Sequence, residues 1–176
     1  MNEKIRLRTT FDQDAFLYDK ARPGYPNALF EDIIAFSKIP ENGRILEIGC
    51  GTAQATLPFA RRGYSIHCIE LGANLAAIAE RNLSPYPKAK VSIGNFEEYP
   101  LQGKSFNLVI SATAFHWIDP DIGYRKAAEV LKLDGVIALF WNKPVQTQIS
   151  ADFVLSVQNV YARVVPEMAK RFPGLV

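Results

Sequence analysis

The stretch RILEIGCGTAQA, residues 44–55, combines a short apolar run with two closely spaced glycines and one acid. Gly49 and Gly51 follow the apolar run directly, where glycine lets a backbone turn tightly and approach a ligand with no Cβ atom in between. Glu47 stands inside a run that would otherwise be uniformly apolar, as buried strands are. These residue types predict a ligand site at the end of a strand, with the acid set against a positive group of the ligand.

The spacing of these residues argues against a dinucleotide site. A G-x-G-x-x-G fingerprint would place its third glycine at position 54, which here is Gln54, and would normally have an apolar residue at position 47. S-adenosylmethionine, by contrast, carries an ammonium beside a sulfonium. We therefore expect Glu47 to face the ammonium of that cofactor, and we keep a dinucleotide-dependent oxidoreductase as the alternative.

Two later positions suit the remaining parts of that ligand. Glu70 ends the apolar stretch YSIHCIE, where nucleotide sites of this kind carry an acid for the ribose hydroxyls, about 20 residues after the glycines. We expect a Glu70→Ala variant to bind the cofactor more weakly and to keep the stability of the ligand-free protein. Asn95 and Phe96 follow the next apolar stretch, where an amide and an aromatic ring can bond to and stack on an adenine.

A regular alternation of elements positions these residues at strand ends. From Arg44 onward, short runs rich in Ile and Val alternate with segments of helical period, which is typical of parallel strands joined by right-handed crossovers. Asp119 before Pro120 predicts a capped helix start, and Asp134-Gly135 predicts a turn. The pattern predicts a doubly wound, mostly parallel α/β sheet of about five strands. The expected strands are 44–49, 64–70, 89–94, 105–112 and 136–141, and the expected helices are 11–21, 27–38, 54–62, 73–83, 120–132 and 151–164.

The overall composition limits the class of protein. With 176 residues, of which 48% are hydrophobic, the chain is long enough for one domain with a substantial core. A net charge of +2, spread along the chain, offers no basic stripe for nucleic acid. No run reaches the roughly 20 apolar residues of a membrane helix, and the N-terminus has no apolar signal core. We therefore expect a cytoplasmic protein that contacts neither nucleic acid nor membrane.

The side chains that bind metals are scarce. The chain has two cysteines, Cys50 and Cys68, and two histidines, His67 and His116. Both cysteines fall in expected core segments of a chain without a secretion signal, so we expect reduced thiols and no metal site.

In this combination the chain resembles class I S-adenosylmethionine-dependent methyltransferases, in the type 11 subgroup that includes trans-aconitate methyltransferase-like proteins. The resemblance covers roughly residues 11–142 and rests on E-x-G-x-G-x-[GA], present as EIGCGTA at 47–53. Glu70, Asn95-Phe96 and the stretches AFHW and LKLDGVIALFWN follow in order. Two departures are Ala53, where a third glycine is commoner, and Asn95, where the family usually carries an acid. An amide oxygen still accepts a hydrogen bond, so we expect the binding mode to survive.

The resemblance implies further cofactor contacts. Cys50, between the two glycines, and Leu71, after the strand-ending acid, are assigned to the cofactor site. The segment YDKARPGYP resembles an N-terminal lid, in which Arg22 pairs with the carboxylate of the cofactor and Tyr18 shapes the pocket.

The resemblance also places the loop 111–119 at the mouth where a methyl group is transferred. His116 and Trp117 are the catalytic candidates in this loop. Aromatic rings attract a sulfonium and exclude water. His116 is either a general base for a hydroxyl or amine acceptor, or a packing and orienting residue, because a carboxylate acceptor needs no base.

The expected organisation is one domain over 1–176, with a helical lid at 1–40, a cofactor-binding core at 44–142 and a truncated helical segment at 143–176. The family resemblance implies seven strands, and the last two are missing from the pattern. We therefore expect a fragment or shortened relative of a parent of about 250 residues. The fifth strand would then be an exposed edge, which we expect to be covered either by the chain's own C-terminal helix or by another chain, as in a homodimer through that edge.

These observations predict an S-adenosylmethionine-dependent methyltransferase that acts on a small molecule. The resemblance favours small carboxylic acids as acceptors. Besides the oxidoreductase, the alternative is a catalytically impaired fragment that binds the cofactor without turnover.

Overall fold

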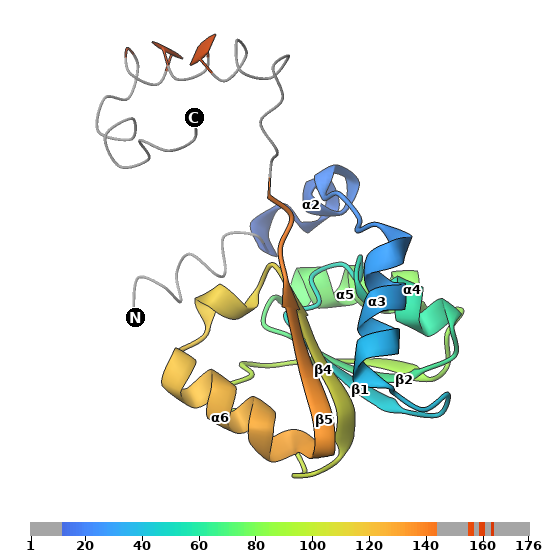
Figure 1. Ribbon diagram of the computed structural model, residues 1–176. Coiled ribbons are helices and arrows are strands. Elements are labelled where there is room, and N and C mark those ends of the chain that lie inside the picture. The colour runs from blue at the N-terminus through green and yellow to red at the C-terminus, as the bar shows by residue number, and fades with distance from the viewer. Residues whose placement is uncertain (1–11, 144–154, 157–158, 161–162, 164–176) are drawn as a thin grey trace. The chain divides into compact units, whose positions relative to one another are not determined.

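Five parallel strands form the sheet in the part of the chain that the structure describes. The computed structural model describes residues 12–143, 155–156, 159–160 and 163 (Figure 1). The strands are β1 (Arg44–Ile48), β2 (Ser65–Glu70), β3 (Ala89–Ile93), β4 (Phe106–Ala112) and β5 (Leu131–Phe140). Their order is β3-β2-β1-β4-β5, and every neighbouring pair is parallel. This arrangement confirms the predicted doubly wound α/β fold.

Helices cover both faces of this sheet. They are α2 (Ala15–Ala21), α3 (Asn27–Ser37), α4 (Thr56–Arg61), α5 (Ala73–Leu83) and α6 (Pro120–Val130), with the 3-10 turn η1 (Phe115–Trp117). Phe30 of α3 and Phe59 of α4 lie in one core cluster, with ring centroids 5.3 Å apart, while Val130 of α6 lies in the other. Figure 1 shows α3 and α6 on opposite sides of the strands.

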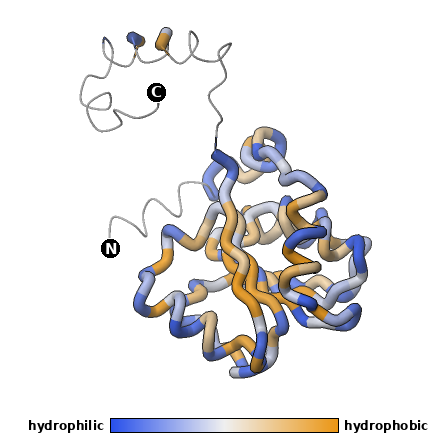
Figure 2. Tube along the Cα trace, viewed as in Figure 1, coloured by the Kyte–Doolittle hydropathy of each residue, from blue (hydrophilic) through white to orange (hydrophobic). Residues whose placement is uncertain are grey.

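The apolar run of β1 is buried because the strand has a helical layer on each face. Ile45 belongs to one core cluster and Leu46 to the other, as the alternation of side chains along a strand requires. Figure 2 shows the hydrophobic stretch along the central strands, with hydrophilic positions on the outer helices. Glu47 therefore points to the same face as Ile45, a placement that matters for the site.

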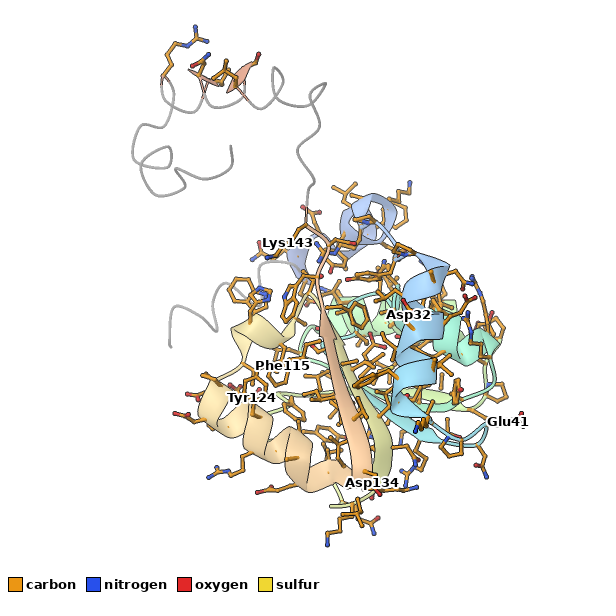
Figure 3. All side chains as sticks on the ribbon, in the orientation of Figure 1. Asp32, Glu41, Phe115, Tyr124, Asp134 and Lys143 are labelled. Atoms are coloured by element: carbon orange, nitrogen blue, oxygen red, sulfur yellow. The ribbon has the colours of Figure 1, made fainter. Side chains whose placement is uncertain are left out.

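The start of α6 follows its predicted chemistry. The Asp119 side chain accepts a hydrogen bond from the backbone N–H of Asp121, at 3.0 Å, and Pro120 opens the helix. Phe115 packs on Tyr124 with ring centroids 4.9 Å apart (Figure 3), which fixes η1 against α6. The loop after β4 is thus anchored to the layer beneath it.

The predicted boundary between α6 and the last strand is wrong. The helix ends at Val130 and β5 begins at Leu131, so the expected Asp134-Gly135 turn lies inside the strand. Pairing with β4 shifts register there: Phe106 pairs with Leu131, but Leu108 pairs with Val136. Asp134 has φ +64°, a left-handed conformation that accommodates extra residues as a bulge.

The N-terminal segment is tied to α5 by polar contacts. Gly72, before α5, offers no side chain to cap the helix, and the Asp12 carboxylate instead accepts from the backbone N–H of Leu75 at 2.9 Å. Further along, Asp19 of α2 lies 3.6 Å from the Arg81 guanidinium. These contacts hold α2 against α5 and place it beside the carboxyl ends of the strands.

The chain divides into two compact units, residues 1–142 and 143–176. In the second unit the structure describes Lys143 and five later residues that are all helical: Leu155, Ser156, Asn159, Val160 and Arg163. Most of the predicted helix 151–164 lies outside the described residues. The single domain and the homodimer through the β5 edge stay predictions. No helix in the described part of the chain is long and apolar enough to cross a membrane.

Two glycines with positive φ allow a test of the turn after β1. Gly49 has φ +68°, and a Cβ there would lie 2.6 Å from the Ala114 Cβ, whereas Gly63 has φ +83° and open space around it. Gly63→Ala should lose about 1–2 kcal/mol of stability from backbone strain alone. Gly49→Ala should lose more, because both Cβ atoms are fixed to backbone and the loop must move.

Urea unfolding of the two variants measures this difference. Gly24→Ala is the control, since nothing lies within 4 Å of a Cβ at Gly24 and its φ is not positive. Equal losses for Gly49→Ala and Gly63→Ala would contradict close packing between the turn after β1 and the loop after β4.

Candidate functional site

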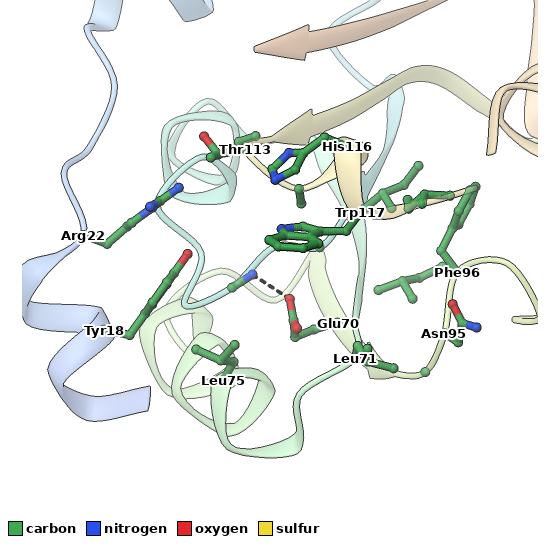
Figure 4. A pocket seen from close by; sticks show the side chains of 18 residues that line it. Tyr18, Arg22, Glu70, Leu71, Leu75, Asn95, Phe96, Thr113, His116 and Trp117 are labelled. Carbon is green, nitrogen blue, oxygen red and sulfur yellow. Dashed lines mark hydrogen bonds between the residues drawn. The ribbon is translucent and has the colours of Figure 1, made fainter. Parts of the chain in front are cut away.

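The carboxyl ends of the strands open onto a cavity (Figure 4). Its walls come from the turns after β1, β2, β3 and β4, together with α2, α5 and the residue that follows α2. The lining residues are Tyr18, Arg22, Ile48, Gly49, Gly51, Ile69, Glu70, Leu71, Leu75, Gly94, Asn95, Phe96, Ala112, Thr113, Ala114, His116, Trp117 and Ile118. Open α/β sheets bind ligands at this edge.

The turn after β1 forms the floor of the cavity and depends on its glycines. Gly49 donates its backbone N–H to the Ile69 carbonyl at 2.8 Å, which ties the turn to β2. Gly51 has φ +56°, and a Cβ on it would lie 3.3 Å from the Tyr18 ring. The Tyr18 ring, on α2, therefore packs over the backbone at Gly51, where there is no room for a side chain.

Glu70 joins this turn to the end of β2. Its Oε2 accepts from the backbone N–H of Gly51 at 2.8 Å, and its Oε1 accepts from that of Gly72 at 3.0 Å. Burial raises the pKa of the Glu70 carboxyl, and the backbone donors of Gly72 and Gly51 oppose that rise. Each carboxylate oxygen keeps further acceptor capacity, so Glu70 can shape the turn and still bond a ligand.

Glu47 does not line the cavity. Its side chain is 1% exposed, and its Oε2 accepts from the Thr56 hydroxyl of α4 at 2.6 Å. Its Oε1 is buried without a hydrogen-bond partner among the described residues. Burial raises the pKa of Glu47 to about 8, so the group is mainly protonated at neutral pH. A neutral acid between β1 and α4 differs from the expected carboxylate that faces an ammonium.

The turn after β3 is braced from α6. Asn95 uses its side-chain oxygen to accept from the backbone N–H of Glu97 at 3.2 Å, so this oxygen shapes the turn. Phe96 is buried at 4% exposure, with the Lys126 ammonium 5.4 Å from its ring centroid. Lys126 also donates to the carbonyls of Glu97 and Tyr99, at 3.2 and 2.6 Å. Lys126 thus holds this wall of the cavity in place.

The loop after β4 supplies aromatic rings at the mouth. The His116 and Trp117 ring centroids are 4.8 Å apart, and Figure 4 shows the Trp117 indole between His116 and Glu70 in this view. The indole Nε1 of Trp141, just after β5, donates to His116 Nδ1 at 3.1 Å. Burial and the nearby Arg22 guanidinium lower the pKa of His116.

A cation and a phenol enter the cavity from the N-terminal side. The Arg22 guanidinium lies 5.5 Å from the Tyr18 ring centroid, and both side chains line the cavity (Figure 4). Burial raises the pKa of Tyr18, while Arg22 opposes that rise. Among the described residues that line the cavity, Arg22 is the only Arg or Lys, and Glu70 is the only Asp or Glu.

Most of the predicted site comes together. The cavity lining includes ten of the twelve predicted residues: Tyr18, Arg22, Gly49, Gly51, Glu70, Leu71, Asn95, Phe96, His116 and Trp117. Glu47 and Cys50 are outside it, and Cys50 is a buried free cysteine. What each residue does toward a ligand stays a prediction.

Sequence reasoning missed three contributors. Thr113 lines the cavity with φ +57°, rare for a β-branched residue, and its hydroxyl lies 2.9 Å from the Tyr25 hydroxyl. Lys126 and Asp12 act on the site through turns and helix ends. The sequence does indicate the need for a residue such as Asp12, because Gly72 has no side chain to cap the helix that follows it, so the cap must come from another segment.

No group of three or more His, Cys, Asp or Glu side chains in the described part of the chain could hold a metal ion.

Residues 46–139, more than half of the chain, match the sequence profile of a family described as the methyltransferase domain. The chain belongs to the methyltransferase-domain family. This is a family of S-adenosylmethionine-dependent methyltransferases of the type 11 kind.

Relatives of this methyltransferase domain are longer proteins. An uncharacterized methyltransferase-like protein of Schizosaccharomyces pombe is 28% identical over 99% of this chain and 69% of its own length. The malonyl-[acyl-carrier protein] O-methyltransferase of Geobacter sulfurreducens is 31% identical over 78% of this chain and 53% of its own length. The chain thus spans about half to two thirds of these relatives.

A solved structure shares the fold of this methyltransferase domain. Phosphoethanolamine N-methyltransferase 2 of Haemonchus contortus, in complex with S-adenosyl-L-methionine, has a TM-score of 0.68 and 20% identity. The match covers 90% of this chain and 40% of that one. At this identity the likeness concerns the fold.

The protonated Glu47 of the methyltransferase domain predicts a specific pH dependence. The unfolded chain ionises Glu47 near its ordinary pKa of 4.5, while the folded chain holds the proton until about pH 8. The contribution of Glu47 to the free energy of unfolding therefore falls as pH rises between these values. Glu47→Gln should remove this fall, since the amide oxygen can still accept from Thr56.

Urea unfolding at about pH 5, 6.5 and 8 measures this effect. At each rise in pH, Glu47→Gln should become more stable relative to wild type. Glu129→Gln, at an exposed position of α6, should follow the wild-type profile. Parallel profiles for Glu47→Gln and wild type would contradict a buried, protonated Glu47.

Removing Glu70 should cost stability even without ligand, which revises the expectation from sequence. Glu70→Ala leaves the amides of Gly51 and Gly72 without their acceptor. Hydrogen bonds to charged groups contribute about 1.5–3 kcal/mol each, and the cost of burying the carboxylate offsets part of that. We expect a loss of about 2 kcal/mol in denaturant unfolding, against almost none for Glu80→Ala on the exposed side of α5. An unchanged unfolding midpoint for Glu70→Ala would show that the two turns hold without it.

Proposed function

We propose that this chain binds S-adenosylmethionine in the cavity and transfers its methyl group to a small-molecule acceptor, a carboxylic acid by preference. The observation that carries the proposal is the placement of Glu70: a buried acid at the end of β2, beside a glycine turn that leaves the backbone open to a ligand. The family and the fold of the chain support the same cofactor.

The residues present fit the adenosine part of the cofactor. Glu70 has acceptor capacity left for the two ribose hydroxyls. Leu71 and Phe96 offer apolar surface on which an adenine can stack, and Asn95 keeps its amide N–H groups as donors. The oxygen of Asn95 already accepts from the Glu97 backbone and has one lone pair left for the adenine amino group, whereas the acid usual in the family would offer two oxygens.

The residues fit the methionine part in a different way from the initial expectation. In this proposal Arg22, which lines the cavity, pairs with the carboxylate, and Tyr18 packs over the turn at Gly51. Glu47 is outside the lining and protonated at neutral pH, so the backbone carbonyls of the turn from Gly49 to Gly51 take over the ammonium.

The chemistry at the mouth needs little from the protein beyond positioning. When bound, S-adenosylmethionine supplies an electrophilic methyl group on a sulfonium. Trp117 offers an aromatic ring to that cation, and together with His116 it excludes water from the acceptor. A carboxylate acceptor is already ionised at neutral pH, so holding it in line with the methyl group is the main task of the site.

Calorimetry with S-adenosylhomocysteine tests this proposal on the intact chain. Saturable binding is expected, and its absence would overturn the proposed function. NADH is the comparison ligand for the oxidoreductase alternative, which Gln54 and the acid at position 47 disfavour. A screen for methylated products distinguishes an active enzyme from a fragment that only binds.

The Arg22→Met variant distinguishes binding of the amino-acid part of the cofactor from binding of its adenosine part. If Arg22 pairs with the carboxylate, the variant should bind S-adenosylhomocysteine about tenfold or more weakly, as for loss of a charged hydrogen bond. Its affinity for 5′-methylthioadenosine, which lacks the amino-acid group, should stay within about twofold of wild type.

Arg61→Met, an exposed position of α4, is the matched control and should bind both ligands as wild type does. Equal weakening of both ligands by Arg22→Met would show that Arg22 shapes the lid and does not pair with the carboxylate.

A further inference from the structure

We propose that Trp141 is a positioning residue that fixes the tautomer of His116, so that His116 presents an N–H donor to the cavity and does not act as a general base. The tautomer follows from the geometry of the chain itself. Its consequence for a methyl acceptor rests on the proposed function.

The direction of one hydrogen bond determines the tautomer. Trp141 Nε1 lies 3.1 Å from His116 Nδ1. An indole nitrogen has a proton to give and no lone pair to offer, so it can only donate. His116 Nδ1 must therefore be the acceptor, and the single proton of the neutral imidazole sits on Nε2.

This tautomer leaves His116 without a free basic nitrogen. A general base takes a proton on an unprotonated ring nitrogen that faces the acceptor. The Nδ1 lone pair of His116 accepts the indole N–H of Trp141, and Nε2 already carries the proton of the neutral ring. The ring can only donate through Nε2, which suits an acceptor oxygen that is ionised before it binds, as in a carboxylate.

The surroundings keep the ring neutral. Burial lowers the pKa of His116, and the positive field of Arg22, from the segment after α2, lowers it further. Trp117, whose ring centroid lies 4.8 Å from that of His116, and Trp141, on the segment after β5, bring no charge to the ring. His116 is therefore mostly neutral at pH 7, and the neutral ring is the form that the indole selects.

The position of Trp141 is held by the strand end on which it sits. Phe140, the last residue of β5, accepts the backbone N–H of Thr113 at 2.8 Å and packs on the Tyr25 ring at 5.0 Å between centroids. Asn142 donates to the Gly24 carbonyl at 3.3 Å. Contacts on both sides of Trp141 therefore join β5 to the loop after β4 and to the segment after α2.

Nitrogen NMR of the full chain tests the proposal directly, because the chain has only two histidines. With labelled histidine, a His116→Gln sample assigns the signals, and His67 serves as an internal reference. In wild type, His116 should be mainly in the Nε2–H form, with and without S-adenosylhomocysteine. Wild-type signals of a mainly Nδ1–H ring would overturn the proposal.

Trp141→Phe keeps an aromatic ring and removes the donor. The Nε2–H to Nδ1–H ratio of His116 should fall about fivefold, the scale of one ordinary hydrogen bond. The pKa of His116 should rise, because only the neutral ring accepts from the indole. Tyr124→Phe, an exposed aromatic position on α6, should change neither quantity.

An unchanged ratio in Trp141→Phe would overturn the role of Trp141. Because Trp141 is 40% exposed, we expect the variant to fold, and circular dichroism checks this. If the variant fails to fold, the wild-type ratio is compared with that of free histidine, and a ratio no higher than the free one overturns the role of Trp141. Calorimetry with S-adenosylhomocysteine remains a separate result, so failure of the proposed function and failure of this inference are distinguishable.

Discussion

The carboxylate of Glu70 ties two turns of the chain together, and the shape of the cavity depends on that tie. It accepts the backbone N–H of Gly51 after β1 and that of Gly72 after β2. Burying a carboxylate is unfavourable, as the raised pKa shows, and the two backbone donors offset part of that cost. Glu70 also lines the cavity, so the group that organises the turn is the one that we propose for the ribose hydroxyls.

The walls around this tie are held by contacts between distant parts of the chain. Asp12 caps α5, Lys126 of α6 braces the turn after β3, and Trp141 bonds the loop after β4. Each contact ties a loop or a helix end at the carboxyl edge of the sheet to a distant part of the chain. Since residues 12–22 contribute both Asp12 and Arg22, the N-terminal segment is part of the site.

The fold could be predicted to within a few residues because its signals are local. Apolar runs between glycines mark the strands, and their alternation with helices predicts a parallel sheet with right-handed crossovers. The order β3-β2-β1-β4-β5 comes from the structure. The last helix and strand were misplaced because Asp134-Gly135 has the composition of a turn, and the structure uses it as a bulge. Composition alone does not distinguish these two uses of a left-handed Asp.

The sequence by itself determined the family, the sheet and ten of the residues that line the cavity. Eight of them end or follow strands, which must meet at one edge of a parallel sheet, while Tyr18 and Arg22 came from the family resemblance. Tertiary structure alone decided what those residues face. Glu47 is two residues from Gly49 in sequence, yet the alternation of β1 turns it toward Thr56 and away from the cavity. His116 obtains its tautomer from a tryptophan 25 residues away. Local sequence encodes backbone conformation and burial, but hydrogen-bond partners are set by which elements the packing brings together.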